Sequence, residues 1–316
     1  MYEKIVEAAH RLDGIAHKTP VLTSTLLNER TGNHMFLKCE NFQRMGAFKF
    51  RGAYHTISSL SQEARRKGVI AYSSGNHAMA TALTCKLLDI PATVVMPEDA
   101  PRVKTDAVQD YGATIIRYNR KTESREEIAQ DLIHTFDYTL IPPFDAISII
   151  AGQGTVAKEL IEETGELDYL LVPCGGGGLI SGCAVAAKHL LPECKVIGAE
   201  PALSDDAAKS FKTGTLQTLK TPHSIADGLN TPSLGKITFP LIMEHVDDFI
   251  TVSEEEIKSA MYFLWTRLKV VVEPSGAVAL AAYRQLSAKG KKVGVVLSGG
   301  NVDVRKASDL FKDIMD

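Results

Sequence analysis

Residues 169–182 have the sequence YLLVPCGGGGLISG, in which four consecutive glycines follow an apolar run and precede small and apolar residues. The apolar run predicts a buried β-strand, and the stretch from Leu179 to Leu191 predicts a helix. Glycine has no Cβ, so the backbone can close tightly around an anion, and the unpaired amides that begin a helix point toward it. Gly175 to Gly178 therefore predict a phosphate-binding loop rather than a flexible linker.

Two common glycine motifs do not match this loop. The dinucleotide-binding motif requires a glycine at its sixth position, which Ile180 or Ser181 occupies here. The nucleoside-triphosphate loop ends in Gly-Lys-Ser/Thr, whereas Leu179 follows Gly178. A later predicted strand still ends in Glu200, where a dinucleotide fold would bind a ribose hydroxyl. A nicotinamide-binding protein therefore stays an alternative hypothesis.

Short β-rich runs alternate with helical stretches from Gly68 onward. Runs that are apolar on both faces are typical of parallel strands covered by helices on each side. We therefore expect a doubly wound α/β fold of two lobes with a cleft between them. Pro142 and Pro143 force extended backbone and are the best candidate for a hinge. The predicted strands are Val69–Tyr72, Ala92–Met96, Thr114–Tyr118, Tyr169–Val172, Lys195–Ala199 and Val293–Leu297.

Length and composition exclude several functional classes. The 316 residues are 45% hydrophobic, enough for a large core, and the net charge of −3 argues against nucleic acid or an anionic membrane as partner. The charged amphipathic helix predicted for Met1–Arg11 is not a signal peptide, and no apolar run approaches the roughly 20 residues of a membrane span. We expect a cytoplasmic protein. Its five cysteines form no Cys-x-x-Cys pair and predict buried, reduced thiols.

Two more polar turns follow predicted strands. Ser73–His77 follows the strand that ends at Tyr72, and Ser298–Asn301 follows the strand that ends at Leu297. Ligands of open α/β sheets bind outside the carboxyl ends of the strands. We therefore expect these two turns and the tetraglycine loop to converge on one small anionic ligand.

Lys49 lies in the sequence MGAFKFRG (residues 45–52), where small residues and two aromatic rings surround a single amine. Desolvation among apolar rings and a nearby arginine both disfavour a charged amine, as Schiff-base chemistry requires. Lys49 is therefore a candidate nucleophile, and an ordinary surface lysine is the alternative.

Several motifs together resemble the fold-type II pyridoxal phosphate (PLP) enzymes. Within that family they resemble the branch of serine racemases, L-threo-3-hydroxyaspartate ammonia-lyases and serine/threonine dehydratases. The resemblance covers nearly the whole chain and implies a tryptophan synthase β-like fold. The motifs are KCENFQ (38–43), GAFKFRGA (46–53), SSGNH (73–77), AGQGT (151–155), GGGG (175–178), IADG (225–228), EP (273–274) and SGGNVD (298–303).

The resemblance implies a role for each cofactor-binding residue. Lys49 corresponds to the lysine that binds PLP covalently, and Gly175, Gly176, Gly177 and Gly178 correspond to its phosphate loop. Asn76 would bind the ring hydroxyl, and Phe48 would pack on the ring face. Ser298 would meet the pyridine nitrogen. A hydroxyl does not force that nitrogen to be protonated, so the ring is a weaker electron sink, which suits β-elimination.

The resemblance also implies the substrate contacts and the reaction. The substrate carboxylate would bind the turn formed by Ser73, Ser74, Gly75, Asn76 and His77, at the beginning of a helix. In the implied reaction, the amine of Lys49 removes the α-proton and a β-hydroxyl group leaves, giving a 2-oxo acid and ammonia. Ser74 corresponds to the serine that returns the proton to the opposite face in the racemases, so elimination and racemisation would share their first step.

Two further groups of residues come from the racemase branch. Glu200, Ser204 and Asp206 match its divalent-cation loop, in which two carboxylates and one carbonyl suit Mg²⁺, or else Ca²⁺ or Mn²⁺. The alternative is a solvated acidic loop. Arg125 matches an arginine near the mouth of the active site, where it could attract a second carboxylate and favour 3-hydroxyaspartate, although the sequence around it is typical of a solvated helix start.

The expected protein is therefore a PLP-dependent dehydratase with serine racemase activity. By resemblance, residues 1–67 and 145–316 form a large cofactor-binding domain, residues 68–144 form a small mobile domain, and the chain forms a homodimer. Phe144 occupies the place where vertebrate serine racemases have an asparagine, which favours elimination. Two alternatives stay open, a catabolic L-threonine dehydratase that makes 2-oxobutyrate and a non-catalytic homologue that senses a ligand.

Overall fold

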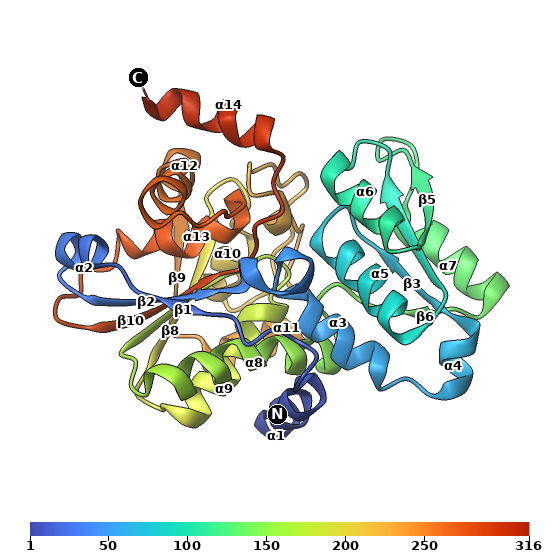
Figure 1. The fold of residues 1–316 in the computed structure, drawn as a ribbon, viewed down its shortest axis with the longest axis horizontal. Coiled ribbons are helices and arrows are strands. Elements are labelled where there is room, and N and C mark those ends of the chain that lie inside the picture. Colours follow the sequence, from blue (N-terminus) through green and yellow to red (C-terminus); the bar gives the residue numbers. More distant parts are fainter. Residues whose placement is uncertain (316) are drawn as a thin grey trace.

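The computed structural model describes residues 1–315, which form two β-sheets with helices on both faces of each (Figure 1). The larger sheet has the strand order β1-β2-β10-β7-β8-β9, and the smaller sheet has the order β5-β4-β3-β6. The strands of the larger sheet are β1 (Val21–Leu22), β2 (His34–Cys39), β10 (Lys292–Leu297), β7 (Tyr169–Pro173), β8 (Lys195–Pro201) and β9 (Asp248–Val252). Those of the smaller sheet are β3 (Val69–Tyr72), β4 (Ala92–Pro97), β5 (Thr114–Tyr118) and β6 (Thr139–Leu140).

The strand pairings confirm the expected α/β fold with parallel sheets. Every pair is parallel except the edge pair β1–β2, which is antiparallel. All six predicted strands are present, to within two residues at either end. The sequence patterns missed β1, β2, β6 and β9. Strands β1 and β6 have two residues each, and β2 contains the buried charged residue Lys38, which interrupts its apolar pattern.

Helices cover the two faces of the larger sheet and form separate cores. Helices α1 (Tyr2–Leu12), α8 (Ile147–Thr164) and α9 (Gly178–Leu190) pack on one face, and α12 (Glu254–Phe263) and α13 (Pro274–Tyr283) pack on the other. Helices α8 and α9 approach closely because they meet at glycines. A Cβ on Gly182 would lie 2.3 Å from the carbonyl oxygen of Ile150, which leaves no room for any other residue.

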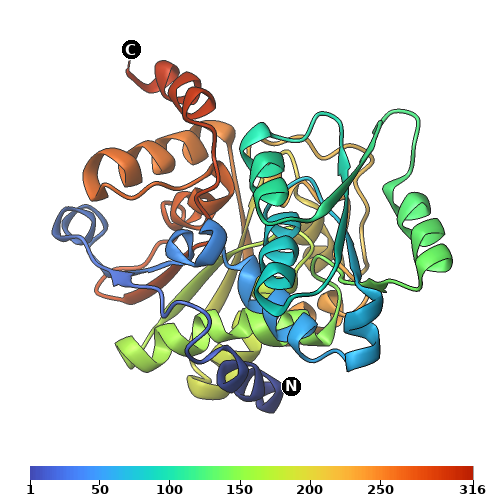
Figure 2. The same ribbon diagram turned by 45° about the vertical axis from the view of Figure 1, so that its right-hand side comes forward.

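The smaller sheet lies between α5 (Asn76–Leu88) and α6 (Arg102–Asp110) on one side and α7 (Arg125–Phe136) on the other (Figure 2). Helix α3 (Lys49–Ser58) packs against both α5 and α8 and so connects the two sheets. The domain boundaries after residues 67 and 144, and the mobility of the smaller part, remain predictions. The remaining helices are α2 (Thr25–Thr31), η1 (Glu40–Phe42), η2 (Arg44–Gly46), α4 (Gln62–Lys67), α10 (Asp206–Thr213), η3 (Asp227–Leu229), α11 (Thr238–His245), η4 (Leu264–Leu268) and α14 (Val304–Met315).

The structure also bears on the predictions about cysteines and membrane spans. The five cysteines are free and buried, as expected. Within residues 1–315, every helix is too short or too polar to cross a membrane.

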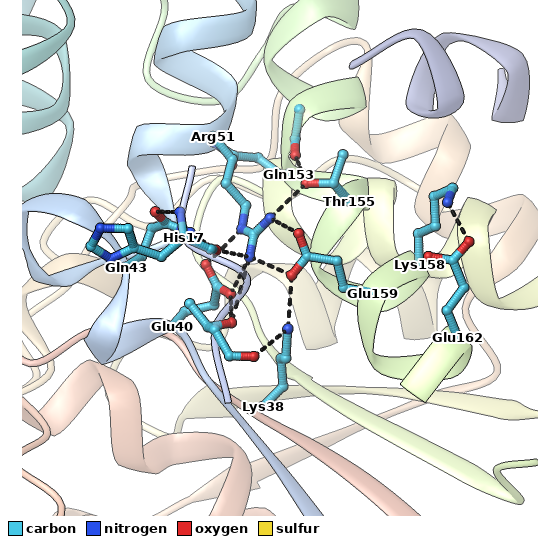
Figure 3. Close-up of polar contacts among 12 residues, drawn as sticks. His17, Lys38, Glu40, Gln43, Arg51, Gln153, Thr155, Lys158, Glu159 and Glu162 are labelled. Carbon is cyan, nitrogen blue, oxygen red and sulfur yellow. Dashed lines mark hydrogen bonds and ion pairs between the residues drawn. The ribbon is translucent and has the colours of Figure 1, made fainter. Parts of the chain in front are cut away.

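Arg51 is the centre of a buried ionic network that joins α3 to β2 and α8 (Figure 3). Its Nε lies 2.8 Å from Oε2 of Glu40, and its Nη1 lies 2.6 Å from Oε1 of Glu159. Lys38 Nζ lies 2.8 Å from the other oxygen of Glu159 and donates to the carbonyl of Thr19. The side chains of Lys38, Glu40 and Arg51 are completely buried. Each charge therefore has an opposite charge as its partner.

Electrostatics within this network oppose the cost of burial. Burial alone raises the pKa of the Glu159 carboxyl, but hydrogen bonds and attraction from Arg51 and Lys38 outweigh it and lower that pKa below its ordinary value of 4.5. Glu159 is thus charged at neutral pH. Because its pKa is depressed in the folded state, its contribution to stability is present above pH 4.5 and is lost as the pH falls through the folded-state pKa.

We predict that Arg51→Met lowers the free energy of unfolding by about 3–5 kcal/mol, because it leaves the buried carboxylate of Glu40 without an opposite charge. Chemical denaturation at pH 7 measures this loss. The control is Lys67→Met, whose ion pairs with Glu63 and Asp137 are exposed and whose removal should change stability much less. Equal losses in the two variants would contradict a dominant role for the buried network. The difference between wild type and Arg51→Met should shrink in acid, as Glu159 becomes protonated.

Candidate active site

One cavity contains most of the residues predicted to bind cofactor and substrate. It lies where the carboxyl ends of strands from both sheets face each other, and α3, α5 and α9 begin at it. Its lining includes Phe48, Lys49, Ser73, Ser74, Gly75, Asn76, His77, Arg125, Gly175, Gly176, Gly177, Gly178 and Ser298. Glu200, Ser204 and Asp206 are not among its lining residues.

Lys49 is the first residue of α3, and its side chain enters the cavity. The amine donates a hydrogen bond to the carbonyl oxygen of Pro143 at 2.5 Å and lies 5.2 Å from the centre of the Phe48 ring. Burial lowers the pKa of this amine from 10.5 to about 8. A substantial fraction of Lys49 is therefore neutral at mildly alkaline pH, as a nucleophile or base requires.

The tetraglycine loop connects β7 to the beginning of α9. Gly177 has a φ of 91°, a left-handed conformation that favours glycine, and the helix begins at the next residue. A Cβ on Gly176 would lie 2.3 Å from the ring of Phe144, and one on Gly178 would lie 3.0 Å from Cβ of the same residue. The loop thus exposes backbone amides where side chains cannot fit. The beginning of a helix as long as α9 favours an anion such as phosphate.

The turn at residues 73–77 places small polar groups at the beginning of α5. The amide of Gly75 donates to Ser73 Oγ at 3.2 Å, and Ser74 lines the cavity. The buried ring of His77 donates from Nε2 to the carbonyl of Ile141 at 2.8 Å. Burial and the nearby Lys49 lower the pKa of His77 to about 3, so the ring is neutral at physiological pH. His77 is therefore a packing residue with a satisfied hydrogen bond in this structure, rather than a base.

Asn76 belongs to a polar cluster that the sequence did not reveal. Its side-chain amide donates to Oε1 of Glu273, and its oxygen accepts from Asn301 Nδ2 at 2.8 Å. Oε2 of Glu273 lies 3.3 Å from Lys104 Nζ, which also lies 2.8 Å from Asp227 Oδ2. Lys104 comes from α6 beside the smaller sheet, whereas Asp227 and Glu273 belong to η3 and the beginning of α13. This buried lysine therefore joins the two halves of the cavity.

Charge pairing determines the ionisation of this cluster. Burial lowers the pKa of Lys104, but attraction to Glu273 and Asp227 outweighs it, and the pKa lies above its ordinary value. Burial raises the pKa of Glu273 even though Lys104 opposes that shift. The sequence signal for Lys104 was weak because a single lysine in a polar helix is indistinguishable from a surface residue. In the sequence, Asp227 and Glu273 were recognised only as members of the IADG and EP motifs.

Ser298 and Phe48 lie on adjacent backbone segments. The amide of Phe48 donates to the carbonyl of Ser298 at 3.1 Å, and Ala47 forms an isolated bridge with Gly299. The hydroxyl of Ser298 is buried and donates to the carbonyl of Ser275 at 3.4 Å. The turn after β10 is therefore attached to the segment that carries Lys49.

Arg125 is the first residue of α7 and reaches the edge of the cavity. Its guanidinium lies 5.2 Å from the centre of the Tyr72 ring, close enough for a cation–π interaction. Its Nε also lies 2.7 Å from Oε1 of Glu126. Tyr72, which sequence analysis did not select, thus helps to hold a positive charge at the cavity, and Glu126 competes for that charge.

Glu200, Ser204 and Asp206 form a separate buried group between β8 and α10. Glu200 accepts hydrogen bonds from the amides of Ala207 and Ala208 at 3.3 and 2.8 Å. Both carboxylate oxygens of Asp206 are buried without a hydrogen-bond partner, and burial raises its pKa to about 7. Residues 1–315 contain no group of three or more His, Cys, Asp or Glu side chains placed to hold a metal ion.

Comparisons with known proteins identify the family. The family model for pyridoxal-phosphate dependent enzymes matches residues 12–299. The chain belongs to this family. The PLP-dependent enzyme is 53% identical to L-threo-3-hydroxyaspartate ammonia-lyase from Saccharomyces cerevisiae over 312 residues, which cover 98% of this chain and 96% of the relative.

Two serine racemases are also similar to this PLP-dependent enzyme. The protein from Schizosaccharomyces pombe is 47% identical over 307 residues, which cover 96% of this chain and 95% of the relative. The structure of maize serine racemase superposes with a TM-score of 0.94 at 42% identity and covers 99% of this chain and 98% of that one. These findings confirm the expected family and fold, and they remove the nicotinamide-binding and non-catalytic alternatives.

The cavity of this PLP-dependent enzyme fits the cofactor. Lys49 supplies a buried amine of lowered pKa, and the tetraglycine loop provides a cradle that any Cβ would fill. Ser298 offers a hydroxyl at the same cavity, which could pair with an unprotonated pyridine nitrogen by turning its proton away from the carbonyl of Ser275. Lys49 would hold PLP covalently and the loop would hold its phosphate.

We predict that covalent loading of the PLP-free enzyme accelerates with pH and levels off above about pH 8, because the neutral amine of Lys49 is the reacting form. Stopped-flow absorbance measures the rate at each pH. Lys49→Ala should abolish the absorbance change but still fold. A rate that continues to rise toward the ordinary lysine pKa of 10.5 would show that the cavity does not lower the pKa of Lys49.

Proposed function

We propose that this enzyme converts a small β-hydroxy amino acid, L-threo-3-hydroxyaspartate or L-serine, to a 2-oxo acid and ammonia, and that it also racemises serine. The observation that carries the proposal is the cavity that holds Lys49, the Ser73–His77 turn and the tetraglycine loop together. The named activities of the yeast relatives support the same chemistry. The cation, the substrate contacts and the homodimer described below are parts of this proposal.

Lys49 would act as the base. Bound PLP supplies an electron sink that makes the α-hydrogen of an amino acid acidic. Once the substrate amine has taken its place on the cofactor, the freed neutral amine of Lys49 would accept that proton, and the β-hydroxyl group would then leave with a proton as water. Addition of one water molecule releases ammonia and leaves the 2-oxo acid. Ser74 would return a proton to the opposite face of the α-carbon, which gives the racemised amino acid instead.

The turn before α5 would bind the α-carboxylate of the substrate. Its amides from Ser74 to His77 begin a helix of 13 residues, which favours a negative charge. The cavity also exposes the hydroxyls of Ser73 and Ser74 as further donors. Asn76 would contact the cofactor ring while Glu273 and Asn301 hold its side chain in place.

Arg125 would bind a second carboxylate and so favour 3-hydroxyaspartate over serine. The guanidinium lies at the cavity and rests over Tyr72. In this structure the Nε–H of Arg125 donates to the carboxylate of Glu126. A substrate carboxylate can accept from the others, since a guanidinium has five N–H groups arranged as a fork.

A divalent cation would bind Glu200, Asp206 and the carbonyl oxygen of Ser204. The fit rests on the two buried Asp206 oxygens that have no partner and on the raised pKa values of both carboxyls, which a cation would reverse. Oxygen ligands of this kind suit Mg²⁺, and also Ca²⁺ or Mn²⁺. Bound there, the cation would hold β8 and α10 together.

The chain would also form a homodimer, as the family resemblance implies. Phe42 and Val271 are each nearly half exposed, and Asn41 Nδ2 donates to the carbonyl of Val271 at 3.0 Å, which places the two apolar residues near each other. Such a pair would be covered in a dimer.

The decisive experiment incubates the PLP-loaded enzyme with L-threo-3-hydroxyaspartate, L-serine or L-threonine, in Mg²⁺ or in EDTA. We expect oxaloacetate from hydroxyaspartate to form fastest, D-serine and pyruvate to form from serine, and EDTA to reduce these rates. Chromatography of the 2-oxo acids and of D-serine measures all products at once. Fast formation of 2-oxobutyrate from threonine that EDTA does not affect would favour a catabolic threonine dehydratase and contradict the cation assignment.

Ser74→Ala separates the two activities in that experiment. The variant should lose roughly 10²- to 10⁴-fold of its racemase rate, the usual effect of removing a proton-transfer group, but should retain elimination. Ser73→Ala, which removes a neighbouring hydroxyl from the same turn, is the matched control. Undiminished racemisation by Ser74→Ala would rule out Ser74 as the second proton-transfer group.

We predict that Arg125→Met raises the KM for hydroxyaspartate about tenfold or more, because it removes a charge-assisted hydrogen bond, and leaves the KM for serine nearly unchanged. Steady-state kinetics with both substrates measure the two values. Glu126→Gln is the matched control and should lower the KM for hydroxyaspartate, because it removes the competing carboxylate. Parallel changes for both substrates would show that Arg125 does not select the second carboxylate.

A further inference from the structure

A second cavity lies between α2, α12 and α13, on the side of the molecule away from the smaller sheet (Figure 1). Its volume is about 270 Å³, and it shares no lining residue with the cavity that contains Lys49. A cavity of about 150 Å³ in a protein can bind benzene, and pockets for drug-sized ligands begin at roughly 300 Å³. The second cavity is therefore large enough for a molecule somewhat bigger than benzene.

Most of the wall of this second cavity is apolar. The apolar and aromatic residues that line it are Leu27, Ala260, Phe263, Leu280, Tyr283 and Leu286. The hydroxyl of Tyr283 donates to the carbonyl of Thr31 at 3.3 Å, so its polar group is satisfied within the protein. Such a wall favours a ligand with an apolar body, because binding removes apolar surface from water.

Two arginines from different helices reach α12 at this cavity. The guanidinium of Arg30, from α2, lies 5.6 Å from the centre of the Phe263 ring. Arg284, at the end of α13, donates from Nη2 to Ser259 Oγ at 3.0 Å. Ser259 and Phe263 are four residues apart on α12, so they are neighbours on one face of that helix. The two guanidinium groups therefore contact the same face of α12, one turn apart.

These two positive charges have no negative partner in the protein. Within residues 1–315, neither Arg30 nor Arg284 forms an ion pair, and no Asp or Glu side chain lines the cavity. A third cation, Lys289, donates to the carbonyl of Thr31 at 2.9 Å and so caps the end of α2. The arginines contact side chains of α12 instead, so helix capping does not account for them. An anion beside both guanidinium groups would relieve their mutual repulsion.

We propose that this second cavity binds a small anion with an apolar body. Arg30 and Arg284 would hold a carboxylate or phosphate head, the two groups that a guanidinium fork matches, and the apolar wall would hold a short alkyl chain or a ring. Because the two cavities share no lining residue, the proposal does not depend on the function proposed for the cavity of Lys49.

The test is calorimetry of the PLP-loaded protein with octanoate and with octyl phosphate, which carry similar chains on different heads. Octylammonium, a similar chain with the opposite charge, and acetate, a carboxylate without the chain, are the ligand controls. Arg30→Gln and Arg284→Gln each remove one guanidinium. Arg66→Gln is the matched control, because Arg66 is also exposed but lies on α4.

We expect one octyl anion to bind per chain. Arg30→Gln and Arg284→Gln should each weaken that binding about tenfold or more, because each removes a charge-assisted hydrogen bond, whereas Arg66→Gln should bind as the wild type does. Octylammonium and acetate should bind at least about tenfold more weakly than the octyl anion. Tighter binding of octyl phosphate would identify phosphate as the preferred head, and equal or tighter binding of octanoate would identify carboxylate.

The proposal would be overturned if neither octyl anion bound, if both arginine variants bound it as tightly as the wild type, or if octylammonium bound equally well. Thermal unfolding of each variant checks the fold. Both arginines are exposed, so the Tm values should stay close to that of the wild type. Losses of affinity that accompany a lowered Tm in both variants would also overturn the proposal, because they would show a structural role.

Discussion

A fully buried guanidinium held between two carboxylates fixes where the reactive lysine can lie. Arg51 and Lys49 are two residues apart at the beginning of α3, so their side chains leave the helix in roughly opposite directions. Glu40 and Glu159 anchor Arg51 in the core between β2 and α8. Lys49 must then point into the cavity. Moving α3 would separate a buried charge from its partners, which costs several kcal/mol, so the position of the lysine is determined by the core behind it.

The front of the cavity depends on a second set of charges. Lys104 comes from α6 beside the smaller sheet and pairs with Asp227 and Glu273 beside the larger one, so it opposes separation of the two sheets. Glu273 also holds the side chain of Asn76. Burial raises the pKa of the Glu273 carboxyl, and the positive charge of Lys104 opposes this shift and favours the carboxylate. The groups around the ligand are therefore organised before any ligand binds, which reduces the reorganisation that binding requires.

The sequence predicted those features that depend on local backbone chemistry. Gly175–Gly178 and the six apolar strands were recognisable because their composition directly restricts the backbone or its burial. Residues whose role depends on distant partners were not recognisable. Lys38 interrupts the apolar pattern of β2, although Glu159, 121 residues away, allows its complete burial. Lys104 was not selected from the sequence for the same reason, since its partners Asp227 and Glu273 are distant in the chain. The family motifs selected Asp227 and Glu273 as positions, but only the fold shows the cation that they share.

The side-chain amide of Asn230, a residue that lines the cavity, connects the cavity to the proposed cation loop. Ser204 lies between Glu200 and Asp206, and its hydroxyl donates to Asn230, whose other bonds hold the segment that ends at Thr231. A cation that binds the carbonyl oxygen of Ser204 would also restrain the Ser204 hydroxyl that donates to Asn230. A cation bound there would thus act on the cavity although the loop contributes no residue to its lining. Without the cation, burial and the lack of hydrogen-bond partners favour the protonated form of the Asp206 carboxyl.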